Sequence, residues 1–452
     1  MMKITILEVI VIFALTCLLP SAASLSSDSA IKVTLQNHLP FPGTVITVDD
    51  EPGDGDFSSI HDALDYANPG DTIEVYSGTY YESNFTISKP NITLRGIPHE
   101  LGNGSDTGKP FIKGNDTADM FHLVNRSITL SGFRIENPGE FYSNYNIFIL
   151  EGGTDCIISN NEIGYCSVGI LSESGNNLIE NNLIYKFRGA LCTGIETCLG
   201  VNRIYNNTIR GGGGFGWGIF LFGSSSGSRI VNNVISDNAV GIGSGASGCY
   251  IANNTVIYND KGIGVSGGKN NIIINNTVHH NNNPKNWGFG IGLGDESNFN
   301  TVKYNTLTFN IHGILIGSAS FNDVSLNTIS NNVNGICFDI NSVGHNTSHN
   351  TVSYNMIKKN SYGVYLSQGG HLRGCVTDNM FFRNNFLNNS ENDAFFCLWL
   401  FRCKNTWSGN YWGEPRILPK VIVGRTGFLP KQMNVPWVNV DWHPAREPYE
   451  LS

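Results

Sequence analysis

Apolar residues recur along this chain in fixed columns rather than as a helical stripe. Alignment on an Asn that precedes an aliphatic pair gives ten anchor positions, spaced 21 to 29 residues apart. The residue two places after each anchor is always apolar, and the residue three places before it is always Ile or Val. The anchors are Asn161, Asn182, Asn207, Asn233, Asn254, Asn276, Asn305, Asn327, Asn355 and Asn379.

A third apolar column follows a Gly in each repeat, as at Ile242 and Ile314, and a further apolar residue often comes two positions later. This alternation predicts a strand with one buried face, so each repeat contains three short strands. The windows lack the i, i+3, i+4, i+7 spacing of a helix and are rich in Gly and Asn, which disfavour helices.

Repeats of about 22 residues with three short strands predict a parallel β-helix, a solenoid in which equivalent residues stack ~4.8 Å apart. The recurring Asn then predicts a ladder at one corner. Its side-chain amide can bond to the Asn above and below, and Asn tolerates a left-handed backbone. The fold class is therefore all-β.

The repeat divides the chain into three expected regions. Residues 45–412 form the β-helix domain, with regular repeats over about 155–380. At its start, an apolar face from Phe57 to Ala67 predicts a short amphipathic helix with Asp56 as N-cap, which would cover the open end of the core. Residues 413–452 contain prolines and no repeat, so we expect an irregular C-terminal tail packed on the solenoid.

The N-terminus predicts export. Lys3 is followed by an apolar run that ends in the small residues of "PSAAS", the pattern of a signal peptide over residues 1–23. Retention of this segment as an uncleaved anchor is the alternative. No later segment is long and apolar enough to span a membrane, and a secreted or cell-surface location follows. Ten Asn-x-Ser/Thr sequons fit a glycosylated surface protein.

Composition narrows the classes of partner and of site. With 52 Gly, 14% charged residues and a net charge of −9, the chain has no basic cluster for a phosphate backbone, so nucleic acid is not an expected partner. Nine cysteines follow the signal peptide, an odd number. Cys192 with Cys198, and Cys397 with Cys403, are candidate disulfides, and buried thiols are the alternative. No spacing matches a zinc site.

Three stretches resemble a known group: residues 56–82, "DFSSIHDALDYANPGDTIEVYSGTYYE", the recurring "NNxI…GI" segments, and "GNYW" at residues 409–412. They resemble secreted right-handed parallel β-helix proteins of the pectin-lyase-like superfamily, particularly archaeal surface proteins with NosD-like or CASH-type repeats. The resemblance covers most of residues 45–412. It implies a right-handed coil and suggests polysaccharide as the substrate class.

A catalytic site is the first hypothesis to weigh. The local motifs of the family's polygalacturonases, pectate lyases and alginate epimerases are absent, but polar residues follow the Gly–Ile strands of neighbouring coils. Two coil rises would separate their carboxylates by ~10 Å, near the separation used in inverting glycoside hydrolysis. Solvent-facing loop residues are the alternative reading. The candidates are Asp295, Glu296, Asp339, His345 and His349.

A binding surface is the second hypothesis. Two lengthened coils add aromatic residues to one side, and the position before the corner Gly is often aromatic. Flat rings spaced along a rigid surface suit the faces of sugars. The alternative is that these rings pack on the solenoid or under the tail. The candidates are Trp217, Trp287, Phe289, His312 and Tyr362.

Together these patterns favour an exported, non-catalytic β-helix protein that binds a polysaccharide or cell-envelope glycan. A glycoside hydrolase or polysaccharide lyase acting near Asp295 and Asp339 is the second hypothesis. A copper-handling accessory protein, suggested only by the NosD name, comes third because the chain has no Met-rich or His-rich tract. No cofactor and no metal are expected, since His279 and His280 have no third ligand beside them in the sequence.

Overall fold

The computed structural model divides the chain into two units, Met1–Phe41 and Pro42–Ser452. The expected signal peptide lies outside the residues that the structure describes. The described residues are 43–114, 118–137, 144–187, 189, 192–283, 288–340, 345–367, 374–398, 403–428 and 433–450.

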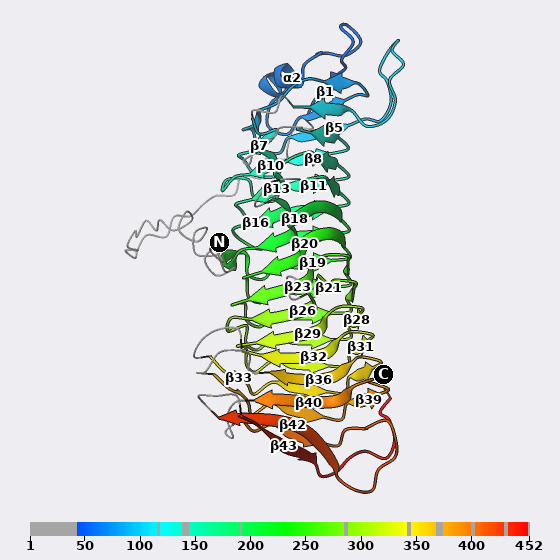
Figure 1. The fold of residues 1–452 in the computed structure, drawn as a ribbon. Helices are drawn as coiled ribbons and strands as arrows, with labels where there is room; N and C mark the ends of the chain where they lie inside the picture. Colours follow the sequence, from blue (N-terminus) through cyan, green and yellow to red (C-terminus); the bar gives the residue numbers. More distant parts are fainter. Residues whose placement is uncertain are drawn as a thin grey trace, which may run out of the picture. The chain divides into compact units, whose positions relative to one another are not determined.

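Within the second unit, three stacks of strands wind around one core, and two of the stacks belong to one continuous sheet (Figure 1). The first stack is a separate sheet, here called sheet A, whose neighbouring strands all pair in parallel. Its strands, in spatial order, are β1 (Val45–Val48), β2 (Thr72–Val75), β5 (Thr93–Gly96), β8 (Thr129–Ser131), β11 (Ile157–Ser159), β14 (Leu178–Glu180), β17 (Arg203–Tyr205), β19 (Arg229–Val231), β21 (Tyr250–Ala252), β24 (Ile272–Ile274), β27 (Thr301–Lys303), β30 (Asp323–Ser325), β34 (Thr351–Ser353), β38 (Met380–Phe382) and β41 (Thr406–Ser408).

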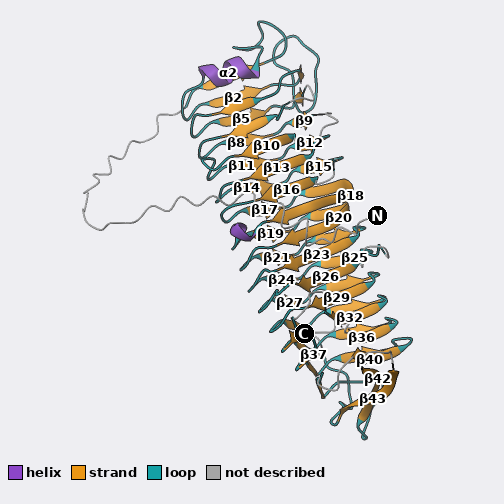
Figure 2. Cartoon of the chain, turned by 60° about the vertical axis from the view of Figure 1, so that its left-hand side comes forward, coloured by secondary structure: helices purple, strands orange, loops and turns teal. Residues whose placement is uncertain are grey.

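The other two stacks form sheet B, in which each coil contributes a short and a longer strand. Figure 2 shows the longer strands lying one above another beside sheet A. The short strands are β3 (Thr79–Tyr80), β6 (Phe111–Lys113), β9 (Arg134–Glu136), β12 (Glu162–Gly164), β15 (Leu183–Tyr185), β22 (Thr255–Ile257), β25 (Thr277–His279), β28 (Thr306–Thr308), β31 (Thr328–Ser330), β35 (Met356–Lys358) and β39 (Asn385–Leu387). The other stack contains β4 (Phe85–Ile87), β7 (Phe121–Leu123), β10 (Tyr145–Ile149), β13 (Val168–Ser172), β16 (Thr193–Thr197), β23 (Lys261–Ser266), β26 (Phe289–Gly294), β29 (His312–Gly317), β32 (Asn334–Asp339), β36 (Tyr362–Ser367) and β40 (Asn392–Leu398).

Two strands, β18 (Thr208–Leu221) and β20 (Val234–Ser244), run through both stacks of sheet B and join them. A short 3-10 helix, η1 (Gly223–Ser225), follows β18, and β33 (Thr347–Ser348) pairs with β37 (Val376–Thr377) beside the solenoid. The expectation of three strands per coil is therefore confirmed.

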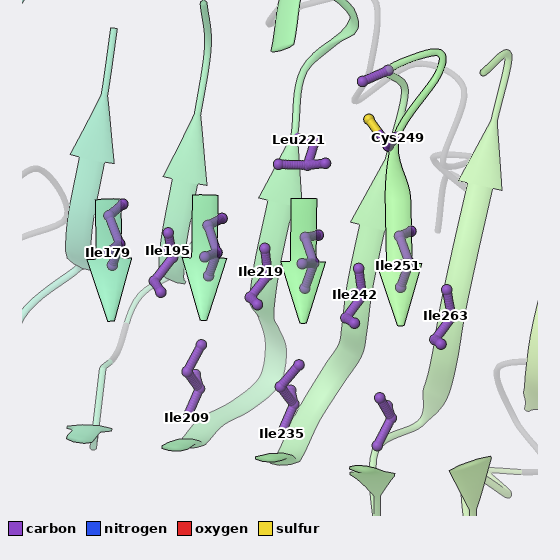
Figure 3. Close-up of a cluster of buried hydrophobic side chains, with 14 of the residues drawn as sticks. Ile179, Ile195, Ile209, Ile219, Leu221, Ile235, Ile242, Cys249, Ile251 and Ile263 are labelled. Atoms are coloured by element: carbon purple, nitrogen blue, oxygen red, sulfur yellow. The ribbon is translucent and has the colours of Figure 1, made fainter. Parts of the chain in front are cut away.

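The core is made of the apolar columns that the repeat predicts. Ile251 from sheet A, Ile235 from the short-strand part and Ile242 from the long-strand part are each 0% exposed. Figure 3 shows such side chains pointing inward from all three stacks, one coil after another. Because equivalent residues pair in register, each coil repeats the same packing.

The Asn ladder is also confirmed, with one change to its mechanism. The backbone N–H and Nδ2 of Asn254 both donate to Oδ1 of Asn276, at 2.9 and 3.0 Å, and Nδ2 also donates to the Ile230 carbonyl. The ladder residue itself does not adopt the left-handed conformation. The residue before it does, as at Asn253 (φ 56°) and Asn275 (φ 56°). Two further Asn ladders flank this one in the later coils, five residues before and five residues after anchors such as Asn305.

The tenth anchor was wrongly placed at Asn379. Asn355 donates instead to Asn384, and Asn379 belongs to the ladder that begins five residues earlier in each coil. Phe386 therefore continues the column after the anchor, and Phe381 continues the sheet A column. All three ladders share the same Asn-rich spacing, so one ladder could be mistaken for another.

The N-terminal helix forms as α2 (Ile60–Tyr66), and it buries Ile60, Ala63 and Leu64 against the end of the core. Its N-cap is Ser59 rather than Asp56. The Ser59 side chain accepts from the Asp62 N–H at 3.3 Å, whereas the Asp56 carboxylate accepts from the backbone and hydroxyl of Thr47. Asp56 lies one turn too early because the backbone between it and Ser59 is not helical.

The C-terminal segment is not irregular throughout. It contains a hairpin of β42 (Lys420–Phe428) and β43 (Met433–Asp441), and β42 continues sheet B by pairing with β40. The carboxylate of Asp441, 0% exposed, ends the central Asn ladder by accepting from the N–H and Nδ2 of Asn410 and from Nε1 of Trp412. The sequence did not predict this hairpin, because residues 413–452 lack the recurring Asn and Gly positions that mark the strands of the repeat.

Among the described cysteines, the structure forms one disulfide, between Cys375 and Cys403 with Cα atoms 5.7 Å apart. Neither candidate pair forms, because Cys192 is a free thiol and Cys403 is bonded to Cys375 rather than to Cys397. Adjacent coils, rather than nearby sequence positions, bring the bonded residues together. Within the part of the chain that the structure describes, no helix reaches the length and hydrophobicity of a membrane span.

Candidate functional site

The longer strands of sheet B turn alternate residues away from the core and so build one continuous outer surface. We call the outward side of β13 to β40 the long-strand face. In β23, Ile263 and Val265 are buried, and Lys261 and Gly264 occupy outward positions. The register aligns one outward column through Trp217, Val240, Lys261, Phe289, His312, Asn334, Tyr362 and Asn392.

This column contains four of the five residues expected to bind carbohydrate. Phe289 and His312 pair directly across β26 and β29, and Tyr362 follows Asn334 across β32 and β36. Trp217 lies three coils before Phe289 in the same column. Trp287 lies outside the described residues. The strands thus bring residues far apart in the sequence onto one surface.

Glycines separate the aromatic groups on this face. The outward column next to the aromatic one contains Gly243, Gly264 and Gly292 in successive coils. A Cβ on Gly292 would lie 2.7 Å from the Phe289 ring, and a Cβ on Gly264 would lie 3.5 Å from it. The Phe289 ring therefore lies against bare backbone, and its position depends on the absence of a side chain at Gly292.

Aromatic clusters lie on either side of the glycines. At one end, the rings of Trp217 and Phe220 are 3.7 Å apart between centroids. At the other end, Tyr362 contacts Tyr365, and Tyr365 stacks on Phe395 at 5.9 Å and 13°. Along the solenoid, this second outward column runs from Phe220 through the three glycines and then through Leu315 and Cys337 to Tyr365.

His312 differs from its neighbours in the column because it is only 6% exposed. Its Nδ1 lies 3.1 Å from Nδ2 of Asn334, and burial lowers the pKa of the imidazole to about 4. The ring is therefore neutral at ordinary pH and lies under the surface. This placement suits a role in positioning its neighbours rather than in touching a ligand.

The residues expected to be catalytic do not form one cluster. Glu296 and His345 meet, with Oε1 and Nδ1 2.8 Å apart, although two coils separate them along the solenoid. Asp295 instead accepts from the Ser266 hydroxyl at 2.8 Å, in the coil before its own. The Asp339 carboxylate accepts from the Ile340 N–H, two coils after Asp295. These two partners, Ser266 and Ile340, lie three coils apart along the solenoid.

His349 also lies apart from these carboxylate contacts. Its ring stacks on Phe321 at 4.9 Å, and Phe321 stacks on Phe299 at 5.1 Å. All three residues have a positive φ, at the corner position that precedes a ladder Asn. Phe299 and Phe321 are about half exposed, so this short aromatic stack lies on the turns between the long strands and sheet A.

Sequence reasoning missed a polar group at the N-terminal end of the long-strand face. Burial raises the pKa of Glu196 and also that of Glu173, one coil earlier. Burial is also the largest cause of the raised pKa of Tyr145, and the charges of Glu196 and Glu173 add to it. The signal was present in the sequence, because Glu196 directly follows a buried Ile of the third column and Glu173 lies three positions after another.

Comparison with known proteins gives one family match. The model described as "Right handed beta helix region" matches residues 112–256 and 218–389, which together span more than half of the chain. The match agrees with the coil described above and supplies its right-handedness. A search of curated proteins found no match.

Solved structures give the same fold. An alginate lyase, AlyF-OU02 in complex with G6, superposes with a TM-score of 0.51 at 13% identity, covering 87% of this chain and 90% of its own. The A-module of the mannuronan C-5 epimerase AlgE6 of Azotobacter vinelandii superposes with a TM-score of 0.50 at 15% identity, covering 79% of this chain and 94% of its own. At such identities the likeness extends to the fold alone.

Proposed function

Because this chain belongs to the right-handed β-helix family, we propose that it is a binding protein whose long-strand face contacts a polysaccharide or cell-envelope glycan. Phe289, Tyr362 and Trp217 are the proposed contact groups, and His312 supports the column from below. The observation that carries the proposal is the column itself: partly exposed rings in register, with glycine backbone beside them.

Physical chemistry supports this assignment. A flat ring offers a pyranose a large apolar surface, and rings held on a rigid sheet lose little conformational entropy when a ligand binds. Gly243, Gly264 and Gly292 leave one stretch of the second outward column without side chains, so an extended sugar chain could lie along that stretch. Two proteins with the same fold carry the names of an alginate lyase and a mannuronan epimerase, which fits a polymeric sugar as ligand.

Location outside the cytoplasm is part of the proposal. The expected signal peptide supports it, and so does the Cys375–Cys403 disulfide, because disulfides persist in oxidising compartments. N-terminal sequencing of protein recovered from the outside of its native cells would show whether the chain begins after residue 23.

Binding is tested by calorimetry and affinity electrophoresis with a panel of alginate, pectin and neutral polysaccharides. Phe289→Ala and Tyr362→Ala should each weaken binding by about threefold to tenfold. This fold-change corresponds to the free energy of one aromatic contact. Phe299→Ala is the matched control, since that ring is exposed but lies off the long-strand face. Equal weakening by the control, or binding to none of the polymers, would overturn the proposal.

A hydrolase or lyase is the second candidate, and the raised pKa values of Glu173, Glu196 and Tyr145 favour this group over Asp295 and Asp339. A carboxyl with a raised pKa can act as a general acid, and a neighbouring Tyr can transfer a proton. Reducing-end and unsaturated-uronate assays detect the two reactions. Glu196→Gln should abolish any turnover, and Glu180→Gln, on sheet A, should preserve it. Turnover that survives Glu196→Gln would exclude this site.

A further inference from the structure

Five carboxylates converge at the N-terminal end of the second unit, away from the long-strand face. Oxygen atoms of Asp49, Asp50 and Glu51 lie within 4.8 Å of one another. Oxygen atoms of Glu51, Glu100 and Asp106 do the same. Glu51 belongs to both groups, so the segment after β1 and a loop some 50 residues later meet at this carboxylate.

Backbone groups orient these carboxylates without neutralising them. The Thr79 N–H donates to Oδ2 of Asp50 at 2.9 Å, and the Asp106 N–H donates to Oε2 of Glu100 at 2.8 Å. Asp49, which is 0% exposed, accepts from the N–H groups of Glu51 and Leu101. In Asp50 and Glu100 the bond fixes one carboxylate oxygen, whereas in Asp49 both oxygens accept.

Three of the remaining oxygens have no donor. Asp50 Oδ1, Glu51 Oε2 and Glu100 Oε1 are each shielded from solvent and lack any hydrogen-bond partner. A carboxylate oxygen shut off from both water and donors is unfavourable by several kcal/mol in general terms. Three such oxygens from three residues that share one cluster indicate a missing positive partner.

No protein cation supplies that partner among the described residues. The ion pairs that the described Lys, Arg and His side chains form are with carboxylates outside this cluster. Carboxylates held this close together repel one another, and a shared cation would remove that repulsion.

We propose that Asp49, Asp50, Glu51, Glu100 and Asp106 form a calcium site. All the proposed ligand atoms are carboxylate oxygens, which suit a hard divalent cation and do not suit copper. Spacings of up to 4.8 Å are compatible with oxygens on opposite sides of Ca²⁺, whose ligand distances are about 2.3–2.6 Å. Gly78 leaves the room this arrangement needs, because a Cβ there would overlap the Asp50 carboxylate.

The site would act as a clip on the N-terminal cap. Its ligands come from the turn that follows β1 and from the loop that follows β5, two segments joined in the structure by the Leu101 to Asp49 and Asn103 to Asp54 hydrogen bonds. A cation shared by both segments would hold them over the first coils, where the core would otherwise be open to water. This inference is independent of the proposed glycan binding.

The test uses the full chain stripped with EDTA and then titrated with CaCl₂. Calorimetry should show binding, and Ca²⁺ should raise the thermal midpoint. Terbium gives a second readout. Its luminescence should be sensitised by Tyr80, whose hydroxyl bonds to the carbonyl of Val48, the residue before Asp49.

Asp50→Asn and Glu51→Gln should each weaken Ca²⁺ binding at least tenfold and remove both the thermal shift and the luminescence. Asp65→Asn, on the exposed side of α2, is the matched control and should bind as the unmodified chain does. In EDTA, Glu51→Gln should melt no lower than the unmodified chain because it removes a like charge, which separates loss of binding from loss of folding. Absence of Ca²⁺ binding to the unmodified chain, or unchanged binding by both variants, would overturn the proposal.

Discussion

The middle coils and the N-terminal cap both hold polar side chains away from water, but they do so in opposite ways. In the middle coils, the amides of Asn233, Asn254 and Asn276 stack with every donor matched to an acceptor. In the cap, Asp50, Glu51 and Glu100 present acceptors only, and three of their oxygens have no donor. An amide can continue its own stack because it carries both functions, whereas a carboxylate needs a partner of another kind.

Two further buried polar groups, Asp441 and His312, fall between these extremes. Asp441 is a carboxylate, but it ends the ladder where only acceptors are needed, and it receives donors from Gly409, Asn410, Trp412 and His443. His312 is neutral at ordinary pH because burial lowers its pKa, so it needs no charged partner. Burial is thus tolerated by pairing, by ending a ladder or by neutralisation, whereas three carboxylate oxygens of the N-terminal cap remain without a donor.

Breaking the ladder should have the largest effect on stability. Asn254→Ala removes the acceptor for both the N–H and Nδ2 of Asn233 and leaves the site of a buried side chain empty. Each lost partner costs about 1–3 kcal/mol, so we expect a loss of about 4 kcal/mol in the free energy of unfolding. Urea unfolding followed by circular dichroism measures it. Asn282→Ala, at an exposed position, is the control, and a loss of similar size there would contradict the ladder's importance.

Neutralisation at His312 should appear as a pH dependence. Its pKa is about 4 in the folded chain and about 6.5 in the unfolded chain, so the unfolded state binds the proton first as the pH falls. The folded state is therefore fully favoured above pH 6.5 and loses up to about 3 kcal/mol as the pH falls through 4.

His312→Gln should flatten this decline between pH 6.5 and 4 in unfolding experiments, whereas His443→Gln, at an exposed position, should leave it in place. An unchanged slope in His312→Gln would show that the imidazole becomes charged inside the fold.

The smallest of the three effects is expected at the end of the ladder. Asp441→Asn preserves the shape and one acceptor oxygen, but the oxygen replaced by NH₂ then faces donors such as the Asn410 N–H and Trp412 Nε1 or the Gly409 N–H. We expect a loss of about 1–2 kcal/mol. The thermal midpoint by calorimetry measures it, and Asp378→Asn, an exposed residue, is the control. An unchanged thermal midpoint in Asp441→Asn would mean that the charge of Asp441 does not stabilise the end of the ladder.

The candidate site was only partly accessible from the sequence. The aromatic column could be predicted because Phe289, His312 and Tyr362 hold the same position relative to the repeat. The burial of His312 could not be predicted from the sequence, because it depends on which side chains cover the column. The sequence placed Glu296 and His345 among the candidate residues of stacked turns, but it predicted neither their contact nor the partners of Asp295 and Asp339. Side-chain direction in a turn depends on the local backbone, which the repeat does not specify.

The amino-acid sequence by itself determined the coil, its core columns and the amide ladders, because each depends on a residue recurring at the same place in every turn. Tertiary structure alone decided the Cys375–Cys403 disulfide, the β42–β43 hairpin and the meeting of Glu51 with Glu100. These contacts join segments that occur once, and no period relates their positions. Where stacking repeats, register propagates from one coil to the next; where it stops, chain ends and loops find their partners only in three dimensions.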